Sequence, residues 1–163
     1  MKTLAKPDPK ARQRPVEILL VEDNPGDVNL LEEAFKSSRF PIHLSVVQDG
    51  EQALNFLRRK SPYSSALKPD LILLDLNLPR KNGHEVAAEI RRSRHFSDIP
   101  TLVLTSSDHD DDKWKAYQTR VSAYLLKPAE WSQYGVLLNY LEENWMKEIR
   151  LDLPPGFLTS GDV

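Results

Sequence analysis

The chain has 163 residues, of which 40% are hydrophobic and 28% charged, and its formal net charge is −2. This composition predicts one folded domain with its own core, and the small net charge argues against a broad basic surface for nucleic acid. The chain contains no cysteine, which excludes disulfides, thiolate catalysis and cysteine-ligated metal sites. Because it also lacks a long apolar run or a secretory signal, we expect a cytoplasmic protein without membrane contact.

The first 15 residues differ in character from the rest of the chain. They contain three prolines, five bases and one acid, whereas the remaining residues are acidic on balance. This composition predicts a flexible tail over residues 1–15, a folded domain over 16–150 and a C-terminal extension over 151–163. A solvated tail is favoured over a nucleic-acid arm, because five bases are few for binding phosphates.

From residue 16 onward, strand patterns alternate with helix patterns. Residues 16–21 form a nearly continuous apolar run, which is typical of a strand covered on both faces. Helical spacing of apolar residues predicts a helix over 25–38, and β-branched residues predict a strand over 42–47. A short helix is expected over 51–59. The prolines and serines of 60–69 predict a loop.

The alternation continues in the second half of the chain. Residues 71–74, 101–105 and 123–126 are short apolar runs that predict three further buried strands. The segments between them have helical patterns, over 83–94 and more weakly over 110–120. These elements repeat the strand–helix order of the first half.

A last helix is expected over 130–149, which completes five strands and five helices. Strict alternation of strands and helices predicts an α/β fold, a doubly wound (βα)5 sandwich around a five-stranded parallel sheet. In such a sheet, ligands bind beyond the carboxyl ends of the strands. The residues that directly follow the strands are therefore the candidate functional residues.

Acids, hydroxyls and an ammonium group occupy those positions. Any one of them alone would be interpreted as a helix cap, a turn residue or a surface charge. Their joint occurrence at one sheet edge favours a functional site instead. They are Glu22 and Asp23 after the first strand, Asp75 after the third, Thr105 and Ser106 at the end of the fourth, and Lys127 after the fifth.

The chemistry of this set points to phosphoryl transfer. Clustered carboxylates repel one another, and Mg²⁺ relieves that repulsion while leaving ligand positions for phosphate oxygens. A carboxylate can attack phosphorus and form an acyl phosphate. The metal, the Lys127 ammonium and the Thr105 hydroxyl would then stabilise the charge on the phosphoryl oxygens. Asp75 is the predicted phosphoacceptor.

The same segments resemble two-component response regulator receiver domains. The resemblance covers about residues 16–149 and rests on four motifs, at 19–23, at 73–79 followed by Gly83, at 104–106 and at 124–128. It implies the flavodoxin-like receiver fold and a regulatory phosphoacceptor rather than an enzyme. It also implies a sensor histidine kinase as the partner that phosphorylates the chain.

The resemblance further implies a role for each matching residue. Asp75 would take the phosphoryl group from a phosphohistidine and would bind Mg²⁺ together with Asp23. Glu22, where many members carry aspartate, would reach the metal through a water. Asn77 would offer its backbone carbonyl.

Four further residues match positions that bind the phosphoryl group or report it. Thr105 and Lys127 would contact its oxygens, with Ser106 in the same group. Tyr124 would swing inward when Thr105 moves toward the phosphate, although a Tyr124 that merely packs on a helix is the alternative. The resemblance implies a cis peptide bond before Pro128.

Residues 22–27 and the aromatic-rich ending are similar to small regulators that partner phytochrome-type histidine kinases. This similarity would make red or far-red light the input. Only residues 150–163 follow the predicted last helix, which are too few for a DNA-binding effector module.

The expected last helix has more apolar surface than one docking face needs. One face is predicted to pack on the sheet, and the excess predicts a homodimer through the fourth helix, fifth strand and fifth helix, or a kinase contact. A C-terminal tail folded over the excess surface is the alternative. The docking face consists of Trp131, Tyr134, Leu138, Leu141 and Trp145, and the excess surface of Val136, Leu137, Tyr140 and Met146.

Two other functions are weaker interpretations of the same residues. A Mg²⁺-dependent phosphatase or hydrolase could use Asp75 as its nucleophile, but it would need a general acid two residues later, where the chain has Asn77. A nucleotide-binding module would need a glycine-rich loop after the first strand, and the whole chain has only six glycines.

Overall fold

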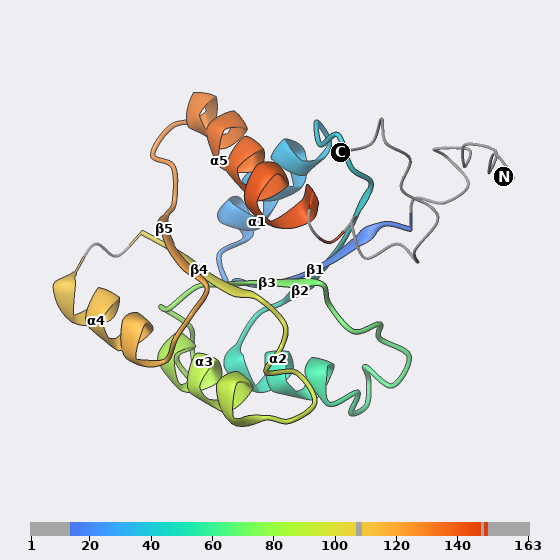
Figure 1. The fold of residues 1–163 in the computed structure, drawn as a ribbon, viewed down its shortest axis with the longest axis vertical. Helices are drawn as coiled ribbons and strands as arrows, with labels where there is room; N and C mark the ends of the chain where they lie inside the picture. Colours follow the sequence, from blue (N-terminus) through green and yellow to red (C-terminus); the bar gives the residue numbers. More distant parts are fainter. Residues whose placement is uncertain (1–13, 107–108, 148, 150–163) are drawn as a thin grey trace, which may run out of the picture.

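A computed structural model describes residues 14–106, 109–147 and 149, and they form a parallel sheet with helices on both faces (Figure 1). The sheet order is β2-β1-β3-β4-β5, and each neighbouring pair of strands is parallel. The predicted doubly wound α/β fold is confirmed. Most of the predicted tail and the extension over 151–163 lie outside the described residues. The strands are β1 (Val16–Val21), β2 (Ile42–Val47), β3 (Leu71–Leu74), β4 (Thr101–Thr105) and β5 (Ala123–Leu126).

Two apolar clusters hold the layers together. Successive side chains of a strand point to opposite faces, so Ile18 and Leu20 of β1 pack in one cluster and Leu19 and Val21 in the other. This explains the continuous apolar run in β1. Helices α1 and α5 cover one face, and α2 and α3 cover the other (Figure 1). The helices are α1 (Pro25–Phe35), α2 (Gly50–Leu57), α3 (Gly83–Arg92), α4 (Asp110–Gln118) and α5 (Tyr134–Leu141).

The C-terminal helical region differs from the single helix expected over 130–149. It begins with a 3₁₀ turn, η1 (Trp131–Gln133), continues as α5, and changes to a π-helical segment, η2 (Glu142–Met146). The wider π turn rotates the following residues around the helix axis. Within the described residues, no helix is long and apolar enough to span a membrane.

Burial in this region differs from the expected pattern, because Leu137 lies on the same face of α5 as Tyr134 and Leu141, and Met146 lies in the π-helical segment. Leu137 and Met146 were expected on the excess surface, but they lie in the core, which corrects that prediction. Trp131 was expected on the docking face, yet it is 54% exposed, because the 3₁₀ turn precedes the part of the helix that packs on the sheet. Tyr134, Leu138 and Leu141 are buried as predicted, so the docking face is partly confirmed.

Two asparagine caps fix the loops that follow β1 and β3. The side chain of Asn24 accepts hydrogen bonds from the backbone N–H groups of Gly26 and Asp27, at 2.9 and 3.2 Å. The side chain of Asn82 accepts one from the N–H of Glu85 at 3.0 Å. A side-chain cap satisfies N–H groups that have no partner within the helix. The caps therefore hold the starts of α1 and α3 beside the strand ends.

Gly83 begins α3 against the loop that carries Asp75. A Cβ atom at position 83 would lie 2.4 Å from the carbonyl oxygen of Asp75 and 2.6 Å from the Cα of Leu76, so the backbone would have to move. We expect Gly83→Ala to lower the free energy of unfolding by about 1–3 kcal/mol. Denaturant titration measures this change.

Gly135 in α5 provides the matched control. A Cβ atom there meets nothing within 4 Å. Gly135→Ala should therefore raise the free energy of unfolding, by up to about 1 kcal/mol, since alanine favours the helix over glycine. If Gly83→Ala were as stable as the wild type, the close approach of α3 to the Asp75 loop would be wrong.

Candidate functional site

The residues that follow the strands lie together because backbone hydrogen bonds extend the sheet beyond the strand ends. The N–H of Glu22 donates to Val47 at 2.9 Å, and the N–H of Asp75 donates to Val21 at 3.1 Å. The N–H of Lys127 donates to the carbonyl of Thr105 at 2.8 Å. These bonds involve the carboxyl ends of all five strands, which meet at one edge of the sheet as the sequence predicts.

Three carboxylates form a cluster at this edge. Glu22, Asp23 and Asp75 each offer an oxygen, and these atoms all lie within 4.8 Å of one another. Glu22 and Asp75 are buried, and Asp23 is exposed. Burial, followed by repulsion from Asp75, raises the pKa of Glu22 to about 7, although a hydrogen bond from Lys127 opposes the rise. A partly buried group of oxygen ligands whose charges repel fits a divalent cation.

Lys127 is the cation at the centre of the cluster. Its Nζ lies 2.9 Å from Glu22 Oε2, 2.8 Å from Asp27 Oδ2 and 3.1 Å from Asp75 Oδ2. Burial alone would lower the pKa of Lys127, but hydrogen bonds to Asp27 and Glu22 and the charge of Asp75 raise it above its usual value. The ammonium group is therefore permanently charged at neutral pH.

Both oxygens of Asp75 have partners that fix the orientation of the carboxylate. Oδ1 accepts a hydrogen bond from the backbone N–H of Asn77 at 3.2 Å, and Oδ2 accepts one from Lys127 Nζ at 3.1 Å. The side chain is buried but lies beside the exposed Asp23. A carboxylate held in this way is suited to act as a nucleophile toward a group that enters from the solvent.

Comparison with known proteins identifies the family. The family model of the response regulator receiver domain matches residues 18–136. The chain belongs to this family. Receiver domains are phosphoacceptors of two-component signalling, so the function and the fold expected from the sequence are confirmed at this level. They are regulatory proteins that work with histidine kinases and bind a divalent metal at an acidic cluster.

Two similar proteins, Rcp1 and RcpA, share most of their length with this receiver domain. The response regulator Rcp1 of Synechocystis sp. is 38% identical over 137 residues, which are 84% of this chain and 93% of Rcp1. The phosphorylated cyanobacterial phytochrome response regulator RcpA has a TM-score of 0.77 at 41% identity, covering 82% of this chain and 95% of RcpA. The Mn²⁺-bound form of Rcp1 has a TM-score of 0.75 at 39% identity, and the match covers 80% of this chain and 94% of Rcp1.

Other predicted site residues of the receiver domain occupy β4 and β5. Thr105 is fully buried at the end of β4, and Ser106 follows it on the exposed surface. Tyr124 is partly buried in β5, where it is the register partner of Val103. Thr105 and Tyr124 thus lie on neighbouring strands, which is the arrangement that a coupled movement requires.

The expected cis peptide bond is not found at Lys127–Pro128. The cis bond in the described part of the chain is Ser61–Pro62, in the loop after α2. Lys127 needs no cis bond to reach the acids here, since its Nζ is already within 3.1 Å of three carboxylates. That prediction is therefore wrong for this structure.

Sequence reasoning missed Asp27 as a member of the site. Asp27 lies in the first turn of α1, and its carboxylate makes the shortest of the three contacts with Lys127. The pKa of Tyr134 is raised by burial and, in addition, by the negative charge of Asp27. The sequence contained a signal for Asp27. The predicted helix begins at Pro25, two residues after Asp23, so its first turn must lie at the same edge of the sheet.

Proposed function

We propose that Asp75 of this receiver domain accepts a phosphoryl group from a phosphohistidine of a sensor histidine kinase. The observation that carries the proposal is the position of Asp75, which is buried, belongs to the cluster of three carboxylates and is hydrogen-bonded to Lys127. No other described aspartate combines an acidic cluster with a buried ammonium group.

The transfer step follows from the groups at this edge. An oxygen of Asp75 attacks phosphorus, the new P–O bond forms, and the P–N bond to the kinase histidine breaks. The imidazole leaves with the bonding electron pair and takes up a proton. Lys127 balances charge on the phosphoryl oxygens, and the Thr105 hydroxyl donates a hydrogen bond to one of them, with Ser106 alongside.

Mg²⁺ is the proposed cofactor. Asp23 and Asp75 would bind it directly, Asn77 through its backbone carbonyl and Glu22 through a water. When bound, Mg²⁺ supplies positive charge to the phosphoryl oxygens. The support is the group of three carboxylates, in which burial and, after it, repulsion from Asp75 raise the pKa of Glu22.

A phytochrome-type histidine kinase is the proposed source of the phosphoryl group, with action in the cytoplasm. The support is similarity alone: RcpA is a phytochrome response regulator, and this chain is 41% identical to it over most of both chains. Red or far-red light would then be the input. Phosphotransfer profiling against the sensor kinases of the host tests the choice of kinase.

A homodimer through α4, β5 and α5 is proposed as the output form. Five large apolar side chains of this region are exposed, and the rings of Trp114 and Tyr117 stack at 5.8 Å between centroids. Aromatic side chains are enriched at interfaces between proteins. We propose that this patch of exposed side chains binds a second copy of the chain. It lies next to β5, which carries Tyr124 and is followed by Lys127, so phosphorylation can affect this surface. The patch consists of Trp114, Tyr117, Leu126, Trp131 and Val136.

One experiment tests phosphorylation and assembly together. The full chain is incubated with acetyl phosphate and Mg²⁺, its intact mass is measured, and borohydride reduction locates the acyl phosphate. We expect one added phosphoryl group on Asp75 and none when EDTA replaces Mg²⁺. Continuous release of phosphate without an adduct would favour the hydrolase instead.

Sedimentation of the same samples reports assembly. We expect phosphorylation to shift the chain toward the dimer, and a monomer under both conditions would end the dimer proposal. Tyr124→Ala should still be phosphorylated but should lose the shift, since Tyr124 is proposed to couple the site to the patch. An unchanged shift in this variant would mean that Tyr124 only packs.

A further inference from the structure

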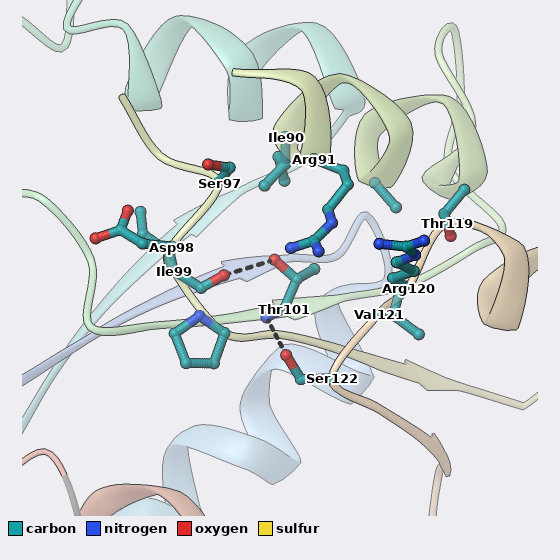
Figure 2. Close-up of a pocket in the computed structure, with 12 residues that line it drawn as sticks. Ile90, Arg91, Ser97, Asp98, Ile99, Thr101, Thr119, Arg120, Val121 and Ser122 are labelled. Carbon is teal, nitrogen blue, oxygen red and sulfur yellow. Dashed lines mark hydrogen bonds between the residues drawn. The ribbon is translucent and has the colours of Figure 1, made fainter. Parts of the chain in front are cut away.

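A pocket lies at the opposite edge of the sheet from Asp75. It is bounded by the end of α3, the start of β4 and the connection from α4 to β5, as Figure 2 shows. Its volume of about 240 Å³ is below the roughly 300–1,000 Å³ of pockets for drug-sized ligands. The pocket is therefore of a size for a small molecule or ion.

Two arginine side chains project into this pocket. Arg91 comes from the last turn of α3 and Arg120 from the residue that follows the C-cap of α4, and Figure 2 shows both directed into the same space. Within the described residues, neither guanidinium group has a hydrogen bond or an ion pair. In contrast, Arg39 and Arg58 are paired with carboxylates.

The acid that borders the pocket does not neutralise these charges. The carboxylate of Asp98 is bound to Lys68 Nζ at 3.1 Å, and Figure 2 shows it turned away from the two guanidinium groups. The buried polar groups of the wall are paired internally: the Thr101 hydroxyl donates to the carbonyl of Ile99, and the Thr101 N–H donates to the Ser122 hydroxyl. The pocket thus has two cations without a counter-charge among the described residues, and the polar groups of its wall that are hydrogen-bonded face one another.

The backbone at Arg120 is in the left-handed region, with φ of 55°. Glycine adopts this conformation without cost, whereas another residue pays on the order of 1 kcal/mol. The turn is closed by the N–H of Val121, which donates to Ala116 at 3.2 Å. Glycine would complete this turn equally well, so Arg120 can be replaced without disturbing the fold.

We propose that the Arg91–Arg120 pocket binds a small organic dianion, either a phosphate monoester or a dicarboxylate. Guanidinium groups bind both phosphate and carboxylate through paired N–H donors. The apolar walls formed by Ile90, Ile99 and Pro100 suit a short carbon skeleton between or beside the charges. Both arginines are exposed, so an anion can reach the pocket directly from the solvent.

The test is a titration of the ¹⁵N-labelled full chain with glycerol 3-phosphate and, separately, with succinate, in EDTA. We expect saturable amide shifts at Ile99, Thr101 and residues 120–122, with a Kd on the order of 1 mM or tighter for at least one probe. The amides next to Asp75 should not move. Shifts that stay linear for both probes, or saturate only at the Asp75 edge, would overturn the proposal.

Two matched substitutions separate the pocket from general charge effects. Arg120→Gly removes one guanidinium group and relaxes the backbone, so it should fold at least as stably as the wild type while losing at least about tenfold in affinity. Arg59→Gly is the control, because Arg59 also has a left-handed φ, of 54°, but lies outside the pocket. Equal losses in both variants would reduce the effect to net charge and refute the site. Neither substitution should change the phosphorylation of Asp75, so failure of this proposal is distinguishable from failure of the proposed function.

Discussion

Asp75→Asn should abolish formation of the acyl phosphate. An amide cannot serve as the oxygen nucleophile, and the change keeps the size of the side chain, so the loss is expected to be complete without unfolding. The intact mass after incubation with acetyl phosphate and Mg²⁺ measures it. The same change removes the negative charge that helps to raise the pKa of Glu22, so that pKa should fall below about 7.

Asp98→Asn is the matched control for this result. The Asp98 side chain is 72% exposed and paired only with Lys68 in the described part of the chain, so its replacement should leave the adduct unchanged. An adduct that persists in Asp75→Asn would place the phosphoacceptor elsewhere. An adduct lost in both variants would point to a general effect of the change rather than to the nucleophile.

Lys127→Met should slow phosphorylation by about 10²–10³-fold, the usual loss when one preorganised donor to a developing charge is removed. The ammonium group contacts the nucleophile and two further carboxylates, so no other described cation can take its place. Methionine retains much of the length and the apolar stem. The rate of adduct formation at saturating Mg²⁺ measures the effect, and a rate within twofold of wild type would exclude Lys127 from the reaction.

Lys127→Met should also make stability depend more steeply on pH. In the folded chain the pKa of Glu22 is raised to about 7 from 4.5, so the folded state holds a proton that the unfolded state has released. The free energy of unfolding therefore falls as the pH rises from 4.5 toward 7. Without Lys127, which lowers this pKa, the fall should extend to higher pH.

The burial of Lys127 and Glu22 determines how much stability Lys127→Met should lose. Lys127 is 10% and Glu22 2% exposed in their side chains. Breaking a buried ion pair costs about 3–5 kcal/mol when the remaining group stays charged. We therefore expect Lys127→Met to lower the free energy of unfolding by about 3 kcal/mol at alkaline pH in EDTA. At acidic pH the loss of stability should be smaller, because Glu22 is then protonated and only the contacts with Asp27 and Asp75 are removed. Denaturant titrations at both pH values check this, and a loss independent of pH would contradict the role assigned to Glu22.

The sheet and the strand-end acids could be predicted because they depend on local pattern and on one rule of topology. Apolar runs of four to six residues locate the strands, and parallel connection sends their carboxyl ends to one edge. Glu22, Asp75 and Lys127 therefore follow from the sequence. The helix ends were less predictable: the helices expected over 25–38 and 110–120 end at Phe35 and Gln118, as helix termini fray.

Features that depend on contacts between distant segments could not be predicted. Asp27 and Lys127 meet across 100 residues, and the orientation of the first turn of α1 decides this contact. The π-helical turn at η2 reverses the expected burial of Met146, and no residue pattern indicates such a turn. Arg91 and Arg120 share a pocket only because the chain returns to it twice, once at each side of β4.

The contacts of Lys127 have a consequence for how donors find this protein. Glu22, Asp27 and Asp75 contact a single ammonium group, and Asp23 lies in the same carboxylate cluster, so the site carries three surplus negative charges when all four acids are ionised. A bound divalent ion would still leave it anionic. A free phosphate compound is consequently repelled on approach rather than drawn in by long-range attraction. Complementary protein surfaces offset this repulsion, so we expect a docked kinase to phosphorylate Asp75 faster than acetyl phosphate does at the same concentration.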